Sequence, residues 1–221
     1  MIITIDGPAG SGKSTVARRL AAILEISYLD TGSMYRAIAY TALRRAIDLH
    51  DEQALLALAR SMDLDLDCGP THTRVRVNGH DVSEAIRSMG VSAATAPVAK
   101  HPGIRAILVA HQRRIGERLG SLVTEGRDQG SVVFPHADVK IVLDASLAKR
   151  AERRCQELAA DGENADLSAV TDDLASRDRT DAKQWKPLLA SKTTTVIDTT
   201  RLTIAEVVDR LASIVGERSA R

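Results

Sequence analysis

Nine consecutive residues near the start of the chain have the types and spacing needed to bind a triphosphate. The first eight match the pattern GxxxxGK[ST], and the nine are Gly7, Pro8, Ala9, Gly10, Ser11, Gly12, Lys13, Ser14 and Thr15. Glycines let successive backbone N–H groups turn inward around a phosphate. Lys13 adds a positive charge for the β- and γ-phosphates, and Ser14 offers its hydroxyl to the Mg²⁺ that bridges them. The pattern therefore predicts a site for ATP with Mg²⁺, in which Ser14 is a metal ligand.

This phosphate-binding loop needs a strand before it and a helix after it, and the sequence supplies both. A β-branched run at residues 2–5 ends directly before the loop. Val16, Leu20 and Leu24 then recur at helical spacing and form an apolar face. A helix that begins near Lys13 also directs the positive end of its dipole toward the phosphates. We therefore expect a working phosphate-binding loop rather than a glycine-rich turn.

Strand and helix patterns alternate along the rest of the chain. Apolar or β-branched runs predict four more strands, at residues 27–29, 121–125, 139–143 and 193–197. Helical spacing predicts helices at residues 34–45, 53–60, 147–158, 167–177 and 203–215, and another that opens at Pro102. Apolar strands joined by helices are typical of a buried parallel sheet. We expect an α/β fold of the P-loop NTPase type, with three layers (αβα) and a five-stranded parallel sheet.

One segment breaks this alternation. Apolar residues alternate with aspartates at 63–67 and with arginines at 74–77, and Asn78-Gly79 is a hairpin turn signal. The pattern predicts a small antiparallel insert, a hairpin plus a helix, at residues 62–101. We expect it to form a lobe over one side of the active cleft.

The remaining residues form the core of the predicted fold. They are residues 1–61 and 102–221, and a polar, glycine-containing break at 159–166 separates two of the predicted helices. This pair is a candidate mobile lid, over about residues 153–186.

Composition excludes several classes of protein. The chain has 221 residues, a formal net charge of +1 and two cysteines. The low net charge does not indicate binding to a nucleic acid polymer or to an anionic membrane. No apolar run approaches the roughly 18 residues of a membrane span. Because Met1 directly precedes the first strand with no leader sequence, we expect a soluble cytoplasmic protein, and we expect a monomer.

The phosphate-binding loop alone does not distinguish GTPases, ATP-driven motors and small-molecule kinases. The chain has neither the DxxG nor the NKxD segment expected of a guanine-specific switch. A kinase needs a second anion site opposite the loop, because the charge on donor and acceptor must be neutralised during transfer. Arginine suits this role, since its planar guanidinium binds phosphate through two N–H groups. The candidates at the ends of predicted elements are Arg36, Arg105, Arg127 and Arg177.

Five segments together resemble bacterial cytidylate kinases. They are the loop at 7–15, LDTGSMYR at 29–36, EAIR at 84–87, EGRDQGSVVFP at 125–135 and VKIVLDAS at 139–146. The resemblance runs nearly from end to end of the chain. It implies transfer of the γ-phosphoryl group of ATP to CMP or dCMP, which gives ADP and the nucleoside diphosphate. It also implies that the insert binds the nucleoside monophosphate.

The resemblance places the acceptor site of the family on seven residues. They are Thr31, Arg36, Arg105, Arg127, Asp128, Arg177 and Asp181. It implies that Arg36, Arg127 and Arg177 hold the acceptor phosphate or the transferring group, with Arg177 approaching from the lid. Arg105 and Asp128 would read the cytosine, since a carboxylate accepts from the exocyclic amine that uracil lacks.

Two further residues complete the nucleoside pocket that the resemblance implies. Asp181 would accept a hydrogen bond from a sugar hydroxyl, and Thr31 would line the pocket. We expect the largest effects on rate from Lys13, Arg127 and Arg177, the candidate catalytic residues.

The chain departs from the family pattern at two places. The lid segment from Arg177 to Pro187 lacks the last arginine of the pattern RDxxDxxR and is one residue shorter. Three nearby cations could supply the missing charge: Arg179, Lys183 and Lys186. A base-contacting serine of the family aligns with Ala96 or with its neighbour Thr95. We therefore expect altered discrimination between pyrimidines.

Two other functions stay open at the level of sequence. One is a kinase for another small acceptor, such as UMP or AMP. A kinase for an alcohol acceptor is disfavoured, because the expected site has an aspartate and an arginine placed to contact a base. The other is a regulatory protein that binds nucleotide through the loop and transfers nothing. CMP-dependent release of ADP would distinguish an enzyme from such a protein.

Overall fold

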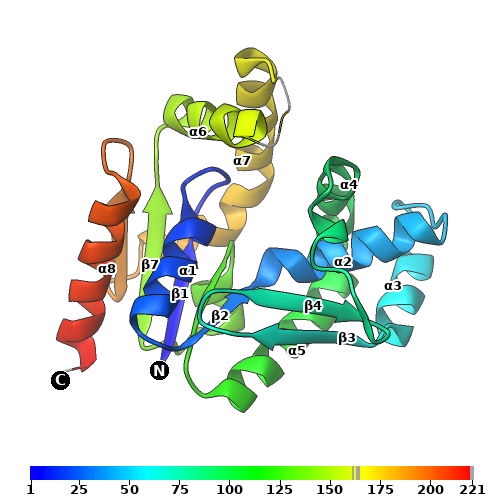
Figure 1. The fold of residues 1–221 in the computed structure, drawn as a ribbon, viewed down its shortest axis with the longest axis horizontal. Coiled ribbons are helices and arrows are strands. Elements are labelled where there is room, and N and C mark those ends of the chain that lie inside the picture. Colours follow the sequence, from blue (N-terminus) through cyan, green and yellow to red (C-terminus); the bar gives the residue numbers. More distant parts are fainter. Residues whose placement is uncertain (161, 163–164, 220–221) are drawn as a thin grey trace.

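A parallel β-sheet forms the centre of the computed structural model, which describes residues 1–160, 162 and 165–219 (Figure 1). Its strands are β1 (Ile2–Asp6), β2 (Ser27–Asp30), β6 (Leu122–Gly126), β7 (Val139–Asp144) and β8 (Thr194–Asp198). They are ordered β2-β6-β1-β7-β8, and every neighbouring pair is parallel. The predicted α/β fold with a five-stranded parallel sheet is confirmed. Because β1 is central, the loop after it lies in the middle of the carboxyl edge of the sheet.

Helices cover both faces of the sheet and make three layers. They include α1 (Lys13–Ile23), α2 (Thr31–Arg44), α5 (Pro102–Leu119), α7 (Leu167–Leu189) and α8 (Ile204–Ser219). Ile141 of β7 packs in a cluster with α1 and α8, whereas the next residue, Val142, packs with Trp185 of α7. Side chains of a strand alternate between the two faces, so one apolar strand contacts both helical layers. The predicted three-layer arrangement is confirmed.

The insert forms a second, antiparallel sheet with short helices. It contains β3 (Leu64–Cys68), β4 (Thr73–Val77), β5 (His80–Asp81), the 3-10 helix η1 (Ala85–Arg87) and α4 (Met89–Lys100), and it follows α3 (Glu52–Ser61). β3 pairs with β4, and the Asn78-Gly79 turn joins β4 to β5, a short strand that the sequence did not predict. Both turn residues have positive φ, as this kind of turn requires.

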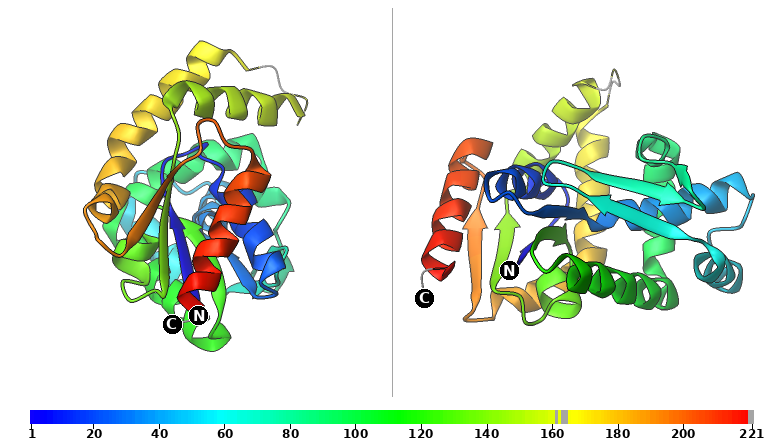
Figure 2. Two further views of the ribbon diagram at one scale, coloured as in Figure 1. Left: turned by 90° about the vertical axis from the view of Figure 1, so that its left-hand side faces the viewer. Right: turned by 60° about the horizontal axis from the view of Figure 1, so that its bottom comes forward.

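The insert shares its core with the main body. Leu66 and Val75 pack in one apolar cluster with Met34 of α2 and Leu108 of α5. Figures 1 and 2 show the insert and α8 at opposite ends of the molecule, with the sheet between them. The apolar cluster on the α2 and α5 side of the sheet therefore extends into the insert, whereas the cluster on the α1 and α8 side does not.

The predicted lid, about residues 153–186, belongs largely to α6 (Leu147–Ala160) and α7, which stand over the carboxyl edge of the sheet (Figure 1). The prediction ended the second helix at residue 177, but α7 continues to Leu189. Leu174, Trp185 and Leu188 are all buried. Their spacing places them on one face of a continuous helix, and packing of this face explains why α7 continues through Pro187.

The closing helix α8 begins with the capping box that the sequence predicted. Thr203 N donates to Glu206 Oε2 at 2.8 Å, and Glu206 N donates to Thr203 Oγ1 at 3.3 Å. The helix then extends four residues beyond the predicted end at 215. No helix in the described part of the chain is long and apolar enough to cross a membrane.

Candidate active site

The phosphate-binding loop joins β1 to α1 and depends on three glycines with positive φ. Gly7, Gly10 and Gly12 have φ angles of 139°, 75° and 90°. A Cβ on Gly7 would lie 2.0 Å from the carbonyl oxygen of Leu143, so this position also excludes a side chain. The predicted strand, loop and helix are therefore present, with Lys13 in the first turn of α1.

Lys13 lies almost fully buried inside the loop. Its Nζ donates to the carbonyl oxygen of Pro8 at 2.7 Å. Burial lowers the pKa of Lys13, and the positive charge of Arg127 lowers it further, against the opposing effect of Glu125 and Asp6. Two cations, one at the start of α1 and one directly after β6, are thus close enough to repel each other. An arrangement of this kind favours a bound anion between them.

Ser14 points to a carboxylate that the sequence did not single out. Ser14 Oγ donates to Glu125 Oε1 at 2.7 Å, and Glu125 is buried at the end of β6. Thr31 Oγ1 donates to the backbone carbonyl of the same residue at 2.7 Å. A hydroxyl and a carboxylate are the oxygen ligands that Mg²⁺ accepts. Ser14 and Glu125 therefore fit a Mg²⁺ that arrives with a nucleotide.

Asp6 is a second carboxylate that sequence reasoning missed. It is fully buried at the end of β1 and accepts from the backbone N–H groups of Gln129 and Gly130, each at 2.8 Å. Burial raises its pKa to about 6, although these two hydrogen bonds lower it. Asp6 thereby attaches the π-helix η2 (Gln129–Val133), which follows Arg127 and Asp128, to the central strand. An acidic residue at the last position of an apolar strand was the available signal.

Arg36 is held at the beginning of α2. Its Nη2 lies 2.6 Å from Asp30 Oδ2, and Asp30 also caps the helix by accepting from Ser33 N at 3.0 Å. Arg87 of the insert approaches the same carboxylate at 3.9 Å. Two guanidinium groups therefore surround one carboxylate at the junction of the insert and the core. The sequence motif around Arg87 was noted, but no role was predicted for that residue.

Arg105 and Asp128 form an ion pair, as expected if they act together. Arg105 Nη2 contacts Asp128 Oδ2, and the carboxylate is largely buried. Arg105 Nη1 also donates to Gln184 Oε1 at 3.3 Å. Gln184 is the residue that stands where the family pattern has its last lid arginine. Its side-chain amide therefore contacts Arg105, the arginine that is expected to bind the cytosine base.

Arg127 and Asp181 form a second ion pair, which joins the end of β6 to α7. Arg127 Nε lies 3.0 Å from Asp181 Oδ2. Arg177 does not join this group of residues. Its Nε pairs with Asp173 one turn earlier on α7 at 3.1 Å, and its side chain is 40% exposed. Of the predicted acceptor residues, the structure thus brings Arg105 to Asp128 and Arg127 to Asp181, and it leaves Arg177 on the exposed part of α7.

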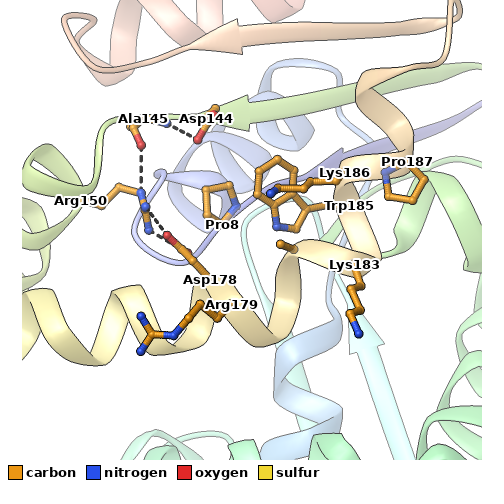
Figure 3. Close-up of a pocket in the computed structure, with 11 residues that line it drawn as sticks. Pro8, Asp144, Ala145, Arg150, Asp178, Arg179, Lys183, Trp185, Lys186 and Pro187 are labelled. Atoms are coloured by element: carbon orange, nitrogen blue, oxygen red, sulfur yellow. Dashed lines mark hydrogen bonds and ion pairs between the residues drawn. The ribbon is translucent and has the colours of Figure 1, made fainter.

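A cleft of about 920 Å³ separates the phosphate-binding loop from α7 (Figure 3). Of the predicted site residues, Pro8 alone lines it. Arg179, Lys183 and Lys186 lie along this cleft. Successive residues of a helix differ by about 100°, so Lys183 and Asp181 point in nearly opposite directions. The three cations considered as substitutes for the missing lid arginine therefore lie away from the Arg127–Asp181 pair.

The fold and the site define a class of protein. A parallel sheet with a phosphate-binding loop on its central strand, an insert on one side and a helical lid above is the architecture of a P-loop phosphotransferase. Residues 3–217 match the family model described as cytidylate kinase. The chain belongs to the cytidylate kinase family.

Curated relatives of similar length support this assignment. The chain is 48% identical over 217 residues to a cytidylate kinase of Geobacillus kaustophilus (strain HTA426), covering 98% of this chain and 96% of the relative. It is 41% identical over 223 residues to a cytidylate kinase of Bacillus licheniformis, covering 100% and 98%. It also matches part of a bifunctional pantoate ligase/cytidylate kinase of Synechococcus sp. (strain JA-3-3Ab), with 45% identity over 96% of this chain and 40% of that protein.

Solved structures of low sequence identity share the fold. A shikimate kinase from Bacteroides thetaiotaomicron has a TM-score of 0.52 at 12% identity, with 98% of each chain covered. The protein TT1252 from Thermus thermophilus has a TM-score of 0.50 at 20% identity, with 98% of this chain and 97% of that chain covered. At these identities the likeness concerns the fold alone.

Proposed function

We propose that the chain transfers the γ-phosphoryl group of ATP to CMP or dCMP and releases ADP with CDP or dCDP. The observation that carries this proposal is the pair of ion pairs, Arg105–Asp128 and Arg127–Asp181, beside the loop that carries Lys13. One pair has the groups to recognise a cytosine, and the other has a cation for a phosphate. Together they make an acceptor site next to a donor site.

The donor site is built from the loop and from two oxygen-bearing side chains. The backbone N–H groups of residues 7–15 and the ammonium of Lys13 would hold the phosphates of ATP. Ser14 and Glu125 would hold Mg²⁺, which neutralises charge on the phosphates when it is bound. Lys13 would exchange the carbonyl oxygen of Pro8 for phosphate oxygens, and this would restore a full positive charge on its ammonium.

The acceptor site distinguishes the parts of a nucleoside monophosphate. Arg36 and Arg127 would bind the phosphate, each in an orientation that its carboxylate partner has already restricted. Asp128 would accept from the exocyclic amine of cytosine, with Arg105 donating to the ring acceptors. Thr31 and Asp181 would lie along the sugar.

Catalysis at such a site depends on positioning the two substrates and neutralising their charge more than on proton transfer. An oxygen of the acceptor phosphate is already a nucleophile at neutral pH, and the transferring group carries most of the negative charge. Lys13, Arg127 and Arg177 would neutralise that charge. Arg177 would reach the site from α7 by leaving Asp173. Closure of the lid, from about residue 153 to the residue before Asp178, would exclude water, which could otherwise accept the phosphoryl group.

The proposed reaction also implies the partners, the cofactor and the location of the protein. ATP and CMP or dCMP are the proposed partners, Mg²⁺ is the proposed cofactor, and the cytoplasm is the proposed location. A monomer is proposed as well.

Release of ADP, measured by a coupled assay, tests the proposal. The protein with ATP and Mg²⁺ is given CMP, dCMP, UMP or AMP in turn, and no acceptor in the control. We expect fast release of ADP with CMP and dCMP, and a smaller preference over UMP than the family pattern would give. ADP release that does not depend on CMP would reject the kinase. A preference for UMP or AMP over CMP would instead support the alternative function, a kinase for another small acceptor.

A further inference from the structure

Arg150 is a buried guanidinium that belongs to none of the predicted site residues. It lies in the first turn of α6 and is 4% exposed. A buried charge is costly unless hydrogen-bonding partners surround it. Figure 3 shows Arg150 at one end of the cleft, with hydrogen bonds to Ala145 and Asp178. The partners of this side chain come from three separate parts of the chain.

The first two partners are backbone carbonyl groups. Arg150 Nε donates to the carbonyl oxygen of Ala145 at 3.0 Å, which fixes the guanidinium against the end of β7. Arg150 Nη1 donates to the carbonyl oxygen of Ala9 at 3.1 Å. Ala9 lies in the phosphate-binding loop, 141 residues earlier in the sequence. Arg150 therefore contacts the outer side of the loop whose inner side is expected to bind phosphate.

The backbone of Arg150 also restricts the loop. A Cβ on Gly10 would lie 3.1 Å from Arg150 Cβ and 3.2 Å from its carbonyl oxygen. Gly10 has a φ of 75°, a conformation that glycine adopts at low cost. This part of the loop thus passes so close to α6 that a side chain at position 10 would crowd the helix.

The third partner is a carboxylate on α7. Arg150 Nη1 lies 3.1 Å from Asp178 Oδ1, and Nη2 lies 2.5 Å from Asp178 Oδ2. This two-point contact fixes the direction of the guanidinium plane as well as its position. Asp178 precedes Asp181, the partner of Arg127, by three residues on the same helix. One side chain therefore connects the phosphate-binding loop to the helix that contacts the acceptor site.

We propose that Arg150 is a positioning residue for ATP. By holding the carbonyl group of Ala9 outward, it keeps the N–H groups of the loop turned inward, toward the phosphates. Through Asp178 it also fixes the distance between the loop and α7. The inference rests on the proposed function in that ATP is taken as the donor, and it adds a residue that acts through the backbone of the loop.

Substitution of Arg150 tests this role by separating ATP from CMP. We expect R150A to raise the KM for ATP, and the Kd for ATP measured by calorimetry, at least fivefold, while the KM for CMP changes less than fivefold. R150K should recover part of the loss in ATP affinity, because an ammonium can reach one acceptor but cannot bridge three. Arg154, an exposed arginine of α6 that pairs with Glu157, provides the matched control. R154A should leave both KM values unchanged.

Two outcomes would overturn the proposal. One is a change of less than fivefold in the KM and Kd for ATP in folded R150A, even if its thermal midpoint falls, because a purely structural role would then suffice. If R150A does not fold, R150K decides, and ATP affinity equal to that of the wild type in R150K would overturn the proposal. Failure of the proposed function looks different, since the wild type itself would then release no CMP-dependent ADP.

Discussion

Single residues set the chemistry of this site through their charged partners. Asp128 is largely buried and has one cationic partner, Arg105. Its carboxylate can only accept hydrogen bonds, so it suits the exocyclic amine of cytosine and opposes the carbonyl oxygen that uracil has there. The same property makes the site sensitive to a single change of a carboxylate to an amide.

Replacement of Asp128 by asparagine should weaken discrimination between the two pyrimidines. The amide of D128N can donate to the carbonyl of uracil, and it removes the charge that holds Arg105. We expect kcat/KM for CMP to fall roughly 100-fold and the ratio of CMP to UMP turnover to fall at least tenfold. Steady-state kinetics with both nucleotides measure this. D67N, at an exposed position of β3, is the control, and an unchanged ratio in D128N would remove Asp128 from base recognition.

Asp6 should make the stability of the protein depend on pH. Its pKa rises from 3.8 to about 6 on folding, so between these values the folded state binds more protons than the unfolded state. Stability is therefore lost as the pH rises from about 4 to about 7, by up to roughly 3 kcal/mol. Urea unfolding of the wild type and of D6N at several pH values measures the difference. The wild type should lose stability relative to D6N over this range, and a difference independent of pH would contradict the prediction.

At the scale of elements, α7 has two parts with different surroundings. From Asp178 onward its side chains contact the core, through Arg150, Arg127 and Arg105. In the earlier part, Arg177 pairs with Asp173, and both of these side chains are exposed. We therefore propose that lid motion is confined to the residues before Asp178, whereas the predicted lid extends to about residue 186.

Arg177 should affect the rate of transfer far more than the binding of ATP. We expect R177A to lower kcat by roughly 100- to 1000-fold, the usual effect of removing one group that stabilises a developing charge, with the Kd for ATP changed less than threefold. R179A, two residues along α7 and on the cleft side, should retain most of the activity. Rapid-quench kinetics and calorimetry measure the two quantities. If R177A kept the wild-type rate, Arg177 would have no part in transfer.

At the scale of the whole molecule, the insert and the core depend on one apolar cluster. Leu66 of β3 is 1% exposed and packs in the same cluster as Leu29 and Leu122 of the central sheet. Trp185, the single tryptophan, lies on α7 against β7 and far along the chain from the insert. The insert should therefore not unfold independently of the sheet.

A cavity in the insert should lower the stability of the whole protein. We expect L66A to reduce the free energy of unfolding by about 2–5 kcal/mol. The transition followed by Trp185 fluorescence should shift by the same amount as the transition followed by far-ultraviolet circular dichroism. V196A, at a half-exposed position of β8, is the control. If only the circular dichroism transition moved, the insert would be an independent unit.

The sequence by itself determined those features that depend on local patterns. The phosphate-binding loop needs a fixed spacing of glycines and a lysine, and the parallel strands need short apolar runs, so both could be read without the fold. The lid helix was predicted too short because the buried face that extends it, with Trp185 and Leu188, contacts a strand distant in sequence. The resemblance to cytidylate kinases supplied the expected acceptor residues but not the ion pairs that they form with one another.

Only the tertiary structure decided which charged groups meet. Arg127 and Asp181 are 54 residues apart, and Arg150 and Ala9 are 141 residues apart. No local spacing records such a contact, because it depends on where β1, β6 and β7 bring the chain together at one edge of the sheet. The same physical reason explains why Glu125, Asp6 and Arg150 went unrecognised. Their roles arise from burial and from partners, and both of these exist only in the folded chain.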